Sequence, residues 1–405
     1  MAGNIAASEW APPGLPTPEP IDWPIGIPKK AKILFVLSGL GAGGAERVVT
    51  ALCNRWRRGG VDVAIATFEN AGATPYYPLE DGLTVHRLGV PTAPDSLLSA
   101  IRQTWLRVRA LSALIRKERP SVVVSFLTKI NIVSLLAAPA DVPVIVSERN
   151  NPKQQRFNIL WRAARAMTFS KAYAFVAMTQ GVIDAYPAYR RPNSKLIPNP
   201  VIIPETIVRR SDGRMLAAVG RLTRQKRFDV LLEAFARIAT DFPDWRLIIW
   251  GEGEERAALE RQRDHLGLTD RVSFPGLSQS PGAWLETADM FVLSSDFEGW
   301  GNVIVEAMAA GLPVISTDCD FGPREIIEHE VSGFLVKHGD ASALAAGLTQ
   351  ILRDDLLRAR LGAAAKVRAE TFALPGVARS WETLFAEAIA ARSRRSKSPA
   401  VRPPA

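Results

Sequence analysis

Residues 290–311 read MFVLSSDFEGWGNVIVEAMAAG: an apolar run, a polar loop, and a second apolar stretch that ends at a glycine. The apolar run predicts a buried strand, and residues 301–310 predict a helix that stops at Gly311. A strand that passes directly into a helix is the repeating unit of a parallel α/β sheet. Ligands of such open sheets bind beyond the carboxyl ends of the strands, which is where this loop falls.

Two glutamates in this stretch are candidate ligand-binding residues. Glu298 falls on the loop, and Glu306 falls near the start of the helix, whose free N–H groups favour anions. A carboxylate can accept hydrogen bonds from two sugar hydroxyls, and the amides beside it can hold a phosphate. The plain alternative is two solvated carboxylates, since a short pattern alone is only a hypothesis.

The same alternation of strands and helices continues along most of the 405 residues, a length that indicates two domains. Expected strands are 33–37, 61–67, 85–88, 122–126, 144–147, 175–178 and 195–197, then 215–220, 246–250, 272–274, 290–293, 313–316 and 333–336. Prolines and polar residues at 198–213 break the pattern and predict the domain boundary. We expect two doubly wound parallel sheets that face a common cleft, an arrangement that suits an enzyme with two substrates.

The domain limits follow from this pattern. The first domain is expected at 31–200 and is completed by a C-terminal helix at about 375–392, and the second is expected at 201–374. Residues 1–30 are rich in proline and 393–405 are basic, so both are expected to be disordered tails. Cys53 and Cys319 stand far apart, which predicts no disulfide framework or zinc site and fits a reducing compartment.

The net charge of +9 favours an acidic partner, such as a phosphorylated substrate or an anionic lipid. No nucleic-acid-binding signature is present, so nucleic acid is not expected as a partner. Two segments, 98–116 and 157–171, place Trp105 or Trp161 in an apolar stripe beside several arginines. Such helices can lie on anionic membranes. The alternative is two helices that pack on a sheet and carry ordinary charged outer faces.

A glycine loop follows the first expected strand. Gly39, Gly41 and Gly44 satisfy the G-x-G-x-x-G pattern, and Glu69 stands where a dinucleotide enzyme keeps its ribose-binding acid. The alternative function is therefore an oxidoreductase that uses NAD(P) or FAD. We favour a different role, in which the loop amides approach a phosphate or an acceptor hydroxyl at the floor of the cleft.

The second half carries further polar residues at expected strand ends. Arg221 and Lys226 can neutralise two phosphates as the charge of a leaving group develops. Gly251 and Gly253 form a glycine turn that suits the approach of a flat base. Because these features and the glutamate pair fall at the same edge of one sheet, they predict a nucleotide-sugar site. Asp318 and Asp320 are assigned to a turn or cap, and no metal is expected.

These residues resemble glycosyltransferase family 4, a retaining family of the GT-B fold. The resemblance spans roughly residues 32–390. It rests on Gly43–Glu46, the basic loop 220–226, Gly251–Gly253, the Glu298 and Glu306 pair, and the AAGLPVI stretch at 309–315. The stretches that begin at Ser147 and Asp318 further resemble bacterial members that extend lipid-linked glycans for exopolysaccharide, O-antigen or protein glycosylation.

The resemblance implies roles for individual residues. Arg221 and Lys226 would hold the donor diphosphate, Glu298 the donor sugar, and Glu306 the ribose hydroxyls. Gly301 and Asn302 would offer amides to the donor, and Gly43 and Gly44 would line the opposite wall. Many members carry a histidine where this chain has Arg149, so a role for that histidine does not transfer. Glu148, Arg149 and Asn150 are candidates for acceptor or donor-sugar contacts.

The activity that this resemblance implies is the transfer of a hexose or N-acetylhexosamine from a UDP- or GDP-sugar, with retention, onto a lipid-linked glycan. The process would be bacterial cell-surface polysaccharide synthesis. The expected location is cytoplasmic and peripheral, on the inner face of the plasma membrane. No cofactor is expected. Besides the oxidoreductase, a GT-B-like sugar-nucleotide epimerase is an alternative, as is a sensor that binds the donor without transferring it.

Overall fold

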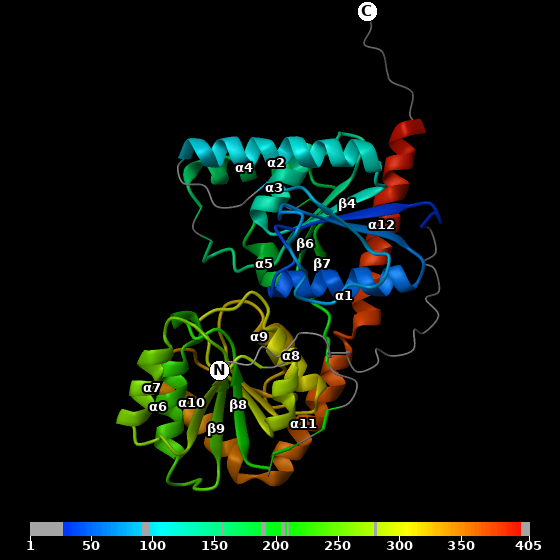
Figure 1. The fold of residues 1–405 in the computed structure, drawn as a ribbon. Helices are drawn as coiled ribbons and strands as arrows, with labels where there is room; N and C mark the ends of the chain where they lie inside the picture. The colour runs from blue at the N-terminus through cyan, green and yellow to red at the C-terminus, as the bar shows by residue number, and fades with distance from the viewer. Residues whose placement is uncertain are drawn as a thin grey trace, which may run out of the picture.

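The computed structural model describes residues 27–90, 97–155, 157–187, 192–203, 207–208, 210–211, 213–278 and 282–397. They form two α/β domains, one above the other in Figure 1. The expected disordered segments lie outside the described residues at 1–26 and 398–405. Ile27 is buried in the core of the first domain, and the last helix continues to Lys397, so the ordered chain extends into both expected tails.

A seven-stranded parallel sheet forms the first domain, with the strand order β3-β2-β1-β4-β5-β6-β7. Its strands are β1 (Lys32–Val36), β2 (Asp62–Thr67), β3 (Thr84–Arg87), β4 (Val122–Phe126), β5 (Val144–Glu148), β6 (Ala174–Ala177) and β7 (Lys195–Leu196). The helices between them are α1 (Gly44–Arg58), α2 (Leu97–Glu118), α3 (Thr128–Ala137), α4 (Ile159–Thr168) and α5 (Gln180–Asp184). One core cluster joins α1 and α12 to the sheet, and a second joins α2, α3 and α5.

The second domain repeats this plan with six parallel strands in the order β10-β9-β8-β11-β12-β13. These are β8 (Met215–Val219), β9 (Arg246–Trp250), β10 (Val272–Gly276), β11 (Met290–Leu293), β12 (Val314–Thr317) and β13 (Phe334–Val336). Its helices are α6 (Phe228–Ile238), α7 (Arg256–His265), α8 (Asn302–Ala309), α9 (Pro323–Ile326), α10 (Ala341–Arg353) and α11 (Asp355–Glu370). Every strand expected from the sequence is present, because continuous apolar runs are typical of strands covered on both faces.

Helix α12 (Leu374–Lys397) returns from the second domain to the first, as Figure 1 shows in red. Trp381 stacks on Phe126 with ring centroids 5.9 Å apart, and Phe385 meets Trp56 edge-on at 5.3 Å. The indole Nε1 of Trp56 donates a hydrogen bond of 2.8 Å to Glu382. These buried contacts anchor the helix in the core of the first domain, which confirms the expected crossing. No helix in the described part of the chain combines the length and apolarity needed to span a membrane.

Candidate active site

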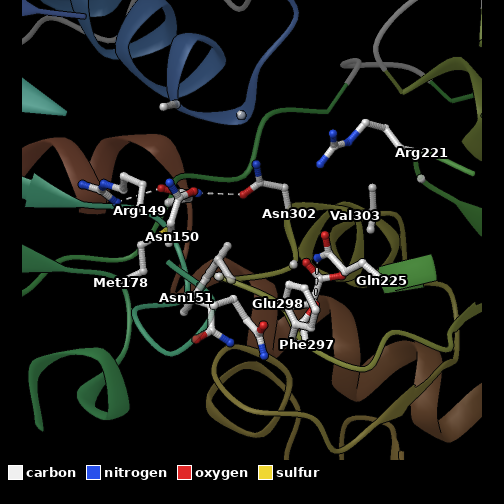
Figure 2. Close-up of a pocket in the computed structure, with 18 of the residues that line it drawn as sticks. Arg149, Asn150, Asn151, Met178, Arg221, Gln225, Phe297, Glu298, Asn302 and Val303 are labelled. Atoms are coloured by element: carbon white, nitrogen blue, oxygen red, sulfur yellow. Dashed lines mark hydrogen bonds between the residues drawn. The ribbon is translucent and has the colours of Figure 1, made fainter. Parts of the chain in front are cut away.

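A cleft of about 600 Å³ opens between the two domains, at the carboxyl ends of both sheets (Figure 2). The first domain contributes the start of α1, the loop after β5 and the segment around Asn199. The second domain contributes the loops after β8 and β11. Of the predicted site residues, the cleft is lined by Gly44, Arg149, Asn150, Arg221, Lys226, Glu298, Gly301 and Asn302. The structure therefore brings both halves of the predicted site into one cavity.

Two helices begin at this cleft from opposite sides. Gly44 is the first residue of α1, and Asn302 is the first residue of α8. A Cβ built on Gly44 would lie 3.2 Å from Nδ2 of the Asn302 side chain. Gly301 precedes α8 with φ of 106°, a conformation that favours glycine. Both N-cap residues are glycines without a side chain, but in the first turn of α1 the Glu46 carboxylate accepts a hydrogen bond from its own backbone N–H. The first N–H groups of α8 can therefore serve an anionic ligand such as a phosphate.

A short ion pair occupies the second-domain side of the cleft. Lys226 Nζ lies 2.6 Å from Glu298 Oε1, and the Ser295 hydroxyl donates to the same oxygen at 2.7 Å. Glu298 is buried although it lines the cleft. Arg221, from the loop after β8, is exposed and extends over the cleft in Figure 2. From the second domain, one carboxylate and two cations therefore border the cavity.

Arg149 is buried at the first-domain wall. Its Nη1 donates to Asn199 Oδ1 at 2.8 Å, and Asn199 donates in turn to Asn302 Oδ1 at 2.9 Å, so this chain of hydrogen bonds crosses the domain interface (Figure 2). Its guanidinium lies over the rings of Phe126 and Trp381. Burial lowers the Arg149 pKa to about 9, which still leaves a cation at neutral pH. Its Nη2 is buried and has no hydrogen-bond partner among the described residues.

Glu148 does not line the cleft, although the sequence made it a candidate for sugar contacts. Its side chain is fully buried, and its carboxylate accepts hydrogen bonds from Thr128 at 2.8 Å, Asn131 at 2.8 Å and Gln155 at 3.2 Å. Burial raises its pKa despite these donors. In this structure the Glu148 carboxylate is bound by side chains of the first domain, behind the wall of the cleft. Asn150, two positions further on, does face the cleft.

Glu306 also lies outside the cleft. Arg47 of α1 reaches across from the first domain and donates to Glu306 Oε1 at 2.5 Å, while its other nitrogen donates to the Ile202 carbonyl at 2.7 Å. Burial raises the pKa of Glu306, and the Arg47 charge opposes that shift. Sequence reasoning missed Arg47. The available signal was its position directly after the Gly-Gly-Ala-Glu motif, one turn into a helix that begins at the cleft.

Gly251 and Gly253, the glycines of the predicted base-binding turn, approach the protein backbone and not the ligand cleft. A Cβ on Gly251 would lie 1.9 Å from the Gly220 carbonyl oxygen, and one on Gly253 would lie 2.3 Å from that of Leu222. Both glycines therefore let the loops after β8 and β9 approach each other, and neither lines the cleft. Gly43 is less constrained, because a Cβ there would meet only the end of the flexible Glu46 side chain.

The Glu69 side chain of the first domain lies against the glycine loop after β1. Glu69 Oε1 accepts a hydrogen bond from the Leu40 amide at 3.1 Å, and a Cβ on Gly39 would lie 2.3 Å from the same oxygen. Glu46 lines the same cavity as Glu69 and also the main cleft. The pKa of Glu46 is raised by burial and, to a lesser degree, by the Glu69 charge. Two carboxylates beside this loop oppose a dinucleotide diphosphate there.

Asp318 and Asp320 form ion pairs with basic side chains of the protein. Asp318 accepts from Arg324 Nε at 2.8 Å, and Asp320 pairs with Lys153 at 2.8 Å. Among the described residues, no group of three or more His, Cys, Asp or Glu side chains is arranged to hold a metal ion.

Family models match both domains of the chain. Residues 43–201 match the Glycosyl transferase 4-like domain, and residues 202–368 match Glycosyl transferases group 1. The chain belongs to the glycosyltransferases. Together the two models take in α1, Arg149, Lys226 and the Glu298 loop, so family membership replaces the oxidoreductase alternative.

Curated relatives of this glycosyltransferase include two that match along nearly their whole length. One, an uncharacterized glycosyltransferase of Haemophilus influenzae, is 23% identical over 87% of this chain and 99% of that protein. The other is a Campylobacter jejuni α-1,4-N-acetyl-D-galactosaminyltransferase whose name specifies a PP-undecaprenol-linked glycan. It is 28% identical, and the match covers 88% of this chain and 98% of that protein.

Solved structures share the fold of this glycosyltransferase. Sucrose-phosphate synthase from Thermosynechococcus elongatus superposes with a TM-score of 0.76 at 20% identity, over 89% of this chain and all of that one. Anabaena Alr3699/HepE in complex with UDP gives a TM-score of 0.69 at 21% identity, over 87% and 99% of the two chains. The two facing sheets and the returning helix are thus the GT-B arrangement that the sequence predicted.

Proposed function

We propose that this glycosyltransferase moves a hexose or N-acetylhexosamine from a UDP- or GDP-sugar onto a lipid-linked glycan, with retention, in bacterial cell-surface polysaccharide synthesis. The observation that carries the proposal is the Lys226–Glu298 pair in a cleft that the start of α8 also borders. A cation next to free backbone amides suits a diphosphate, and a buried carboxylate suits sugar hydroxyls.

The donor diphosphate would lie at the start of α8, within reach of Arg221 and Lys226 and away from the Glu46 carboxylate at the start of α1. The donor sugar would lie against Glu298, with the positive charge of Arg149 at the opposite wall of the cleft. A role for Glu306 at the ribose requires that Arg47 first release its carboxylate.

Retention would follow from a same-face reaction. The acceptor oxygen forms a bond to the anomeric carbon on the face from which the nucleoside diphosphate departs, and the bond from that carbon to the phosphate oxygen breaks. A departing phosphate oxygen takes the proton of the acceptor hydroxyl. The residues of the cleft would then orient the two substrates and stabilise the negative charge on the leaving group.

A second cavity of about 360 Å³ supports an acceptor in which an anionic diphosphate joins a lipid to a glycan. It lies among α2, α3 and α4 and joins the cleft at Leu127 and Asn150, which line both. Arg107 and Lys129 supply positive charge to it, and the Lys129 ammonium lies 5.5 Å from the centre of the Trp161 ring. Basic and aromatic groups in one cavity suit a diphosphate next to sugar rings.

Exposed apolar side chains support a membrane-facing surface beside this cavity. Ile101 and Trp105 project from α2, and Ile159, Leu160 and Met167 project from α4, each at least 48% exposed. Exposed arginines, including Arg102 and Arg109, lie among them. Figure 1 places α2 and α4 at the end of the first domain that is remote from the second domain. Apolar and basic groups on one face suit an anionic lipid surface.

A thermal-shift panel with UDP, GDP and their common sugar conjugates tests the donor assignment, followed by radiolabel transfer to polyprenyl-diphosphate glycans. We expect one nucleotide family to raise the melting temperature and one conjugate to label the lipid. The anomeric configuration of the product, read by NMR, tests retention. Conversion of the nucleotide sugar without an acceptor would favour the epimerase, and binding without any reaction would favour a sensor.

A further inference from the structure

Arg227 has an unusual backbone for its residue type. It connects the 3-10 turn Arg224–Lys226 to helix α6 with φ of 50° and ψ of 43°, in the left-handed region. A residue with a Cβ is strained there, whereas glycine is not. Its side chain makes ionic hydrogen bonds that glycine would lack and that offset this strain.

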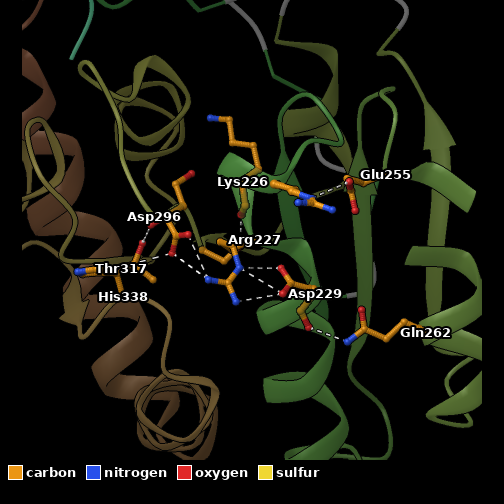
Figure 3. Close-up of polar contacts among 11 residues, drawn as sticks. Lys226, Arg227, Asp229, Glu255, Gln262, Asp296, Thr317 and His338 are labelled. Carbon is orange, nitrogen blue, oxygen red and sulfur yellow. Dashed lines mark hydrogen bonds and ion pairs between the residues drawn. The ribbon is translucent and has the colours of Figure 1, made fainter. Parts of the chain in front are cut away.

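The guanidinium of Arg227 joins two carboxylates (Figure 3). Nε and Nη2 donate to Asp229 at 3.0 and 3.1 Å, and Nη1 donates to both oxygens of Asp296 at 3.1 Å. Asp229 belongs to the first turn of α6, whereas Asp296 belongs to the loop after β11 that carries Glu298. These interactions raise the pKa of Arg227, so the clamp stays charged at any working pH.

Hydrogen bonds on either side of the clamp join the same two loops. The Asp296 amide donates to the Gln225 carbonyl at 2.9 Å, and Gln225 Nε2 donates to the Phe297 carbonyl at 2.9 Å. The Ser294 hydroxyl donates to the Lys226 carbonyl at 2.7 Å. These hydrogen bonds fix the loop after β8 relative to the loop after β11, and Arg227 provides the ionic contact between them.

Arg227 lies behind the active site and not in it. It lines a separate cavity with Asp229 and Asp296, while Lys226 and Glu298 line the main cleft. In Figure 3, the Lys226 side chain extends away from the guanidinium cluster. Each cleft residue stands only one or two positions from a member of the clamp, so a shift of the clamp would move both.

We propose that Arg227 is a positioning residue, which sets the Lys226 ammonium and the Glu298 carboxylate at their working separation through its hold on Asp296. This inference rests on the roles proposed above for Lys226 and Glu298. A small misplacement of such groups lowers turnover far more than it lowers affinity, because their contribution is largest in the transition state.

The deciding variant is Arg227→Gly, measured on the full chain with the nucleotide sugar that the thermal-shift panel selects. Glycine suits the left-handed turn, so we expect an unchanged or higher melting temperature. We expect kcat to fall about 10- to 100-fold, and Kd for the nucleoside diphosphate to change less than about three-fold. Arg224→Ala is the matched control, since that neighbouring side chain is 92% exposed, and it should leave kcat unchanged.

A double-mutant cycle with Asp296→Asn identifies the link. We expect the Arg227→Gly/Asp296→Asn variant to lose no more activity than the worse single variant. Normal kcat in Arg227→Gly would overturn the inference, as would losses of the two single variants that multiply. A wild-type chain that binds and turns over no nucleotide sugar would instead refute the proposed function, and the inference with it.

Discussion

Arg47 and Glu306 form an ion pair of 2.5 Å that joins α1 of the first domain to α8 of the second. The Arg47 side chain is 16% exposed and that of Glu306 is 5% exposed. The residue expected to hold the donor ribose is thus already bound to a cation from the opposite domain. If Glu306 holds the donor ribose as proposed, the donor and Arg47 would compete for one carboxylate.

Replacement of Arg47 by Met is expected to have opposite effects on stability and on binding. Loss of the cation leaves a buried carboxylate unpaired, which costs about 3 kcal/mol and lowers the melting temperature by several degrees. Because Glu306 is released, UDP or GDP should bind at least about three-fold more tightly, a free-energy gain of roughly 0.6 kcal/mol. Calorimetry and thermal unfolding measure the two effects separately.

The matched control is Arg58→Ala, at the other end of α1, whose pair with Glu80 is partly exposed. It should change neither quantity, since exposed ion pairs contribute little. Addition of Glu306→Gln to the Arg47 variant should recover part of the lost stability. Weaker nucleotide binding in Arg47→Met would instead mean that Arg47 itself holds the donor.

Lys226→Ala should lower turnover of the donor by about 10²- to 10³-fold, the loss typical of one preorganised charge-stabilising group. Glu298→Gln removes the partner charge but keeps the shape, so we expect it to lower turnover more than it raises KM for the donor. Steady-state kinetics with the selected nucleotide sugar measure both. Near-normal turnover in Lys226→Ala would remove the diphosphate assignment.

Local sequence pattern was sufficient for the strands and for the main cleft. Apolar runs such as Val122–Phe126 predict buried strands without knowledge of their neighbours. Because Lys226 and Glu298 follow the carboxyl ends of two such strands, the sequence predicted that they share one site. Helix α3 received no prediction. It is apolar on nearly all sides, so the amphipathic period that marks a surface helix is weak there.

The contacts that sequence reasoning missed depend on tertiary arrangement. Arg47 and Glu306 are 259 positions apart, and Asn199 and Asn302 are 103 apart. No local pattern indicates which side chains will meet when the two domains face each other. Arg227 was missed for another reason: its left-handed backbone is usual for glycine, so only the coordinates reveal the strain and the two carboxylates that stabilise it.

Both thiols should be unreactive in the folded chain. Burial, with a smaller effect of the Glu298 charge, raises the pKa of Cys319 to about 12, and burial also raises the pKa of Cys53. At pH 8 only about one Cys319 in 10⁴ would be a thiolate. Ellman's reagent should label neither residue until guanidinium unfolds the chain, when two thiols appear. Rapid labelling of the native chain would contradict this packing.

The same shift of Cys319 predicts how stability changes with pH. Because the folded pKa lies above the ordinary value of 9.0, the stabilisation from this thiol is complete below pH 9. It is lost as the pH rises from 9 toward 12, since the unfolded state releases the proton first. Cys319→Ser should lessen this alkaline loss in urea-unfolding curves recorded from pH 8 to 11, and a loss of equal size in that variant would assign it to other groups.

Lys129→Ala should affect the acceptor and spare the donor. Removal of its positive charge from the cavity beside Trp161 is expected to raise KM for a polyprenyl-diphosphate glycan about ten-fold, which corresponds to roughly 1.4 kcal/mol for one charge-assisted contact. Nucleotide affinity should stay constant. Lys366→Ala is the control, because that lysine is exposed on α11 of the second domain. Equal effects of the two variants would point to general surface charge.

Membrane association should depend on the exposed apolar residues of α2 and α4. Vesicles with about 30% phosphatidylglycerol should co-sediment the chain at low salt, and higher salt should release it as charges are screened. The double variant Trp105→Ser/Leu160→Ser should reduce binding at least ten-fold, because two large apolar side chains no longer enter the interface. Leu356→Ser is the matched control, since Leu356 is 83% exposed on α11 of the second domain. Equal losses in the control, or binding to neutral vesicles that salt does not weaken, would assign the association to nonspecific hydrophobic contact and not to this face.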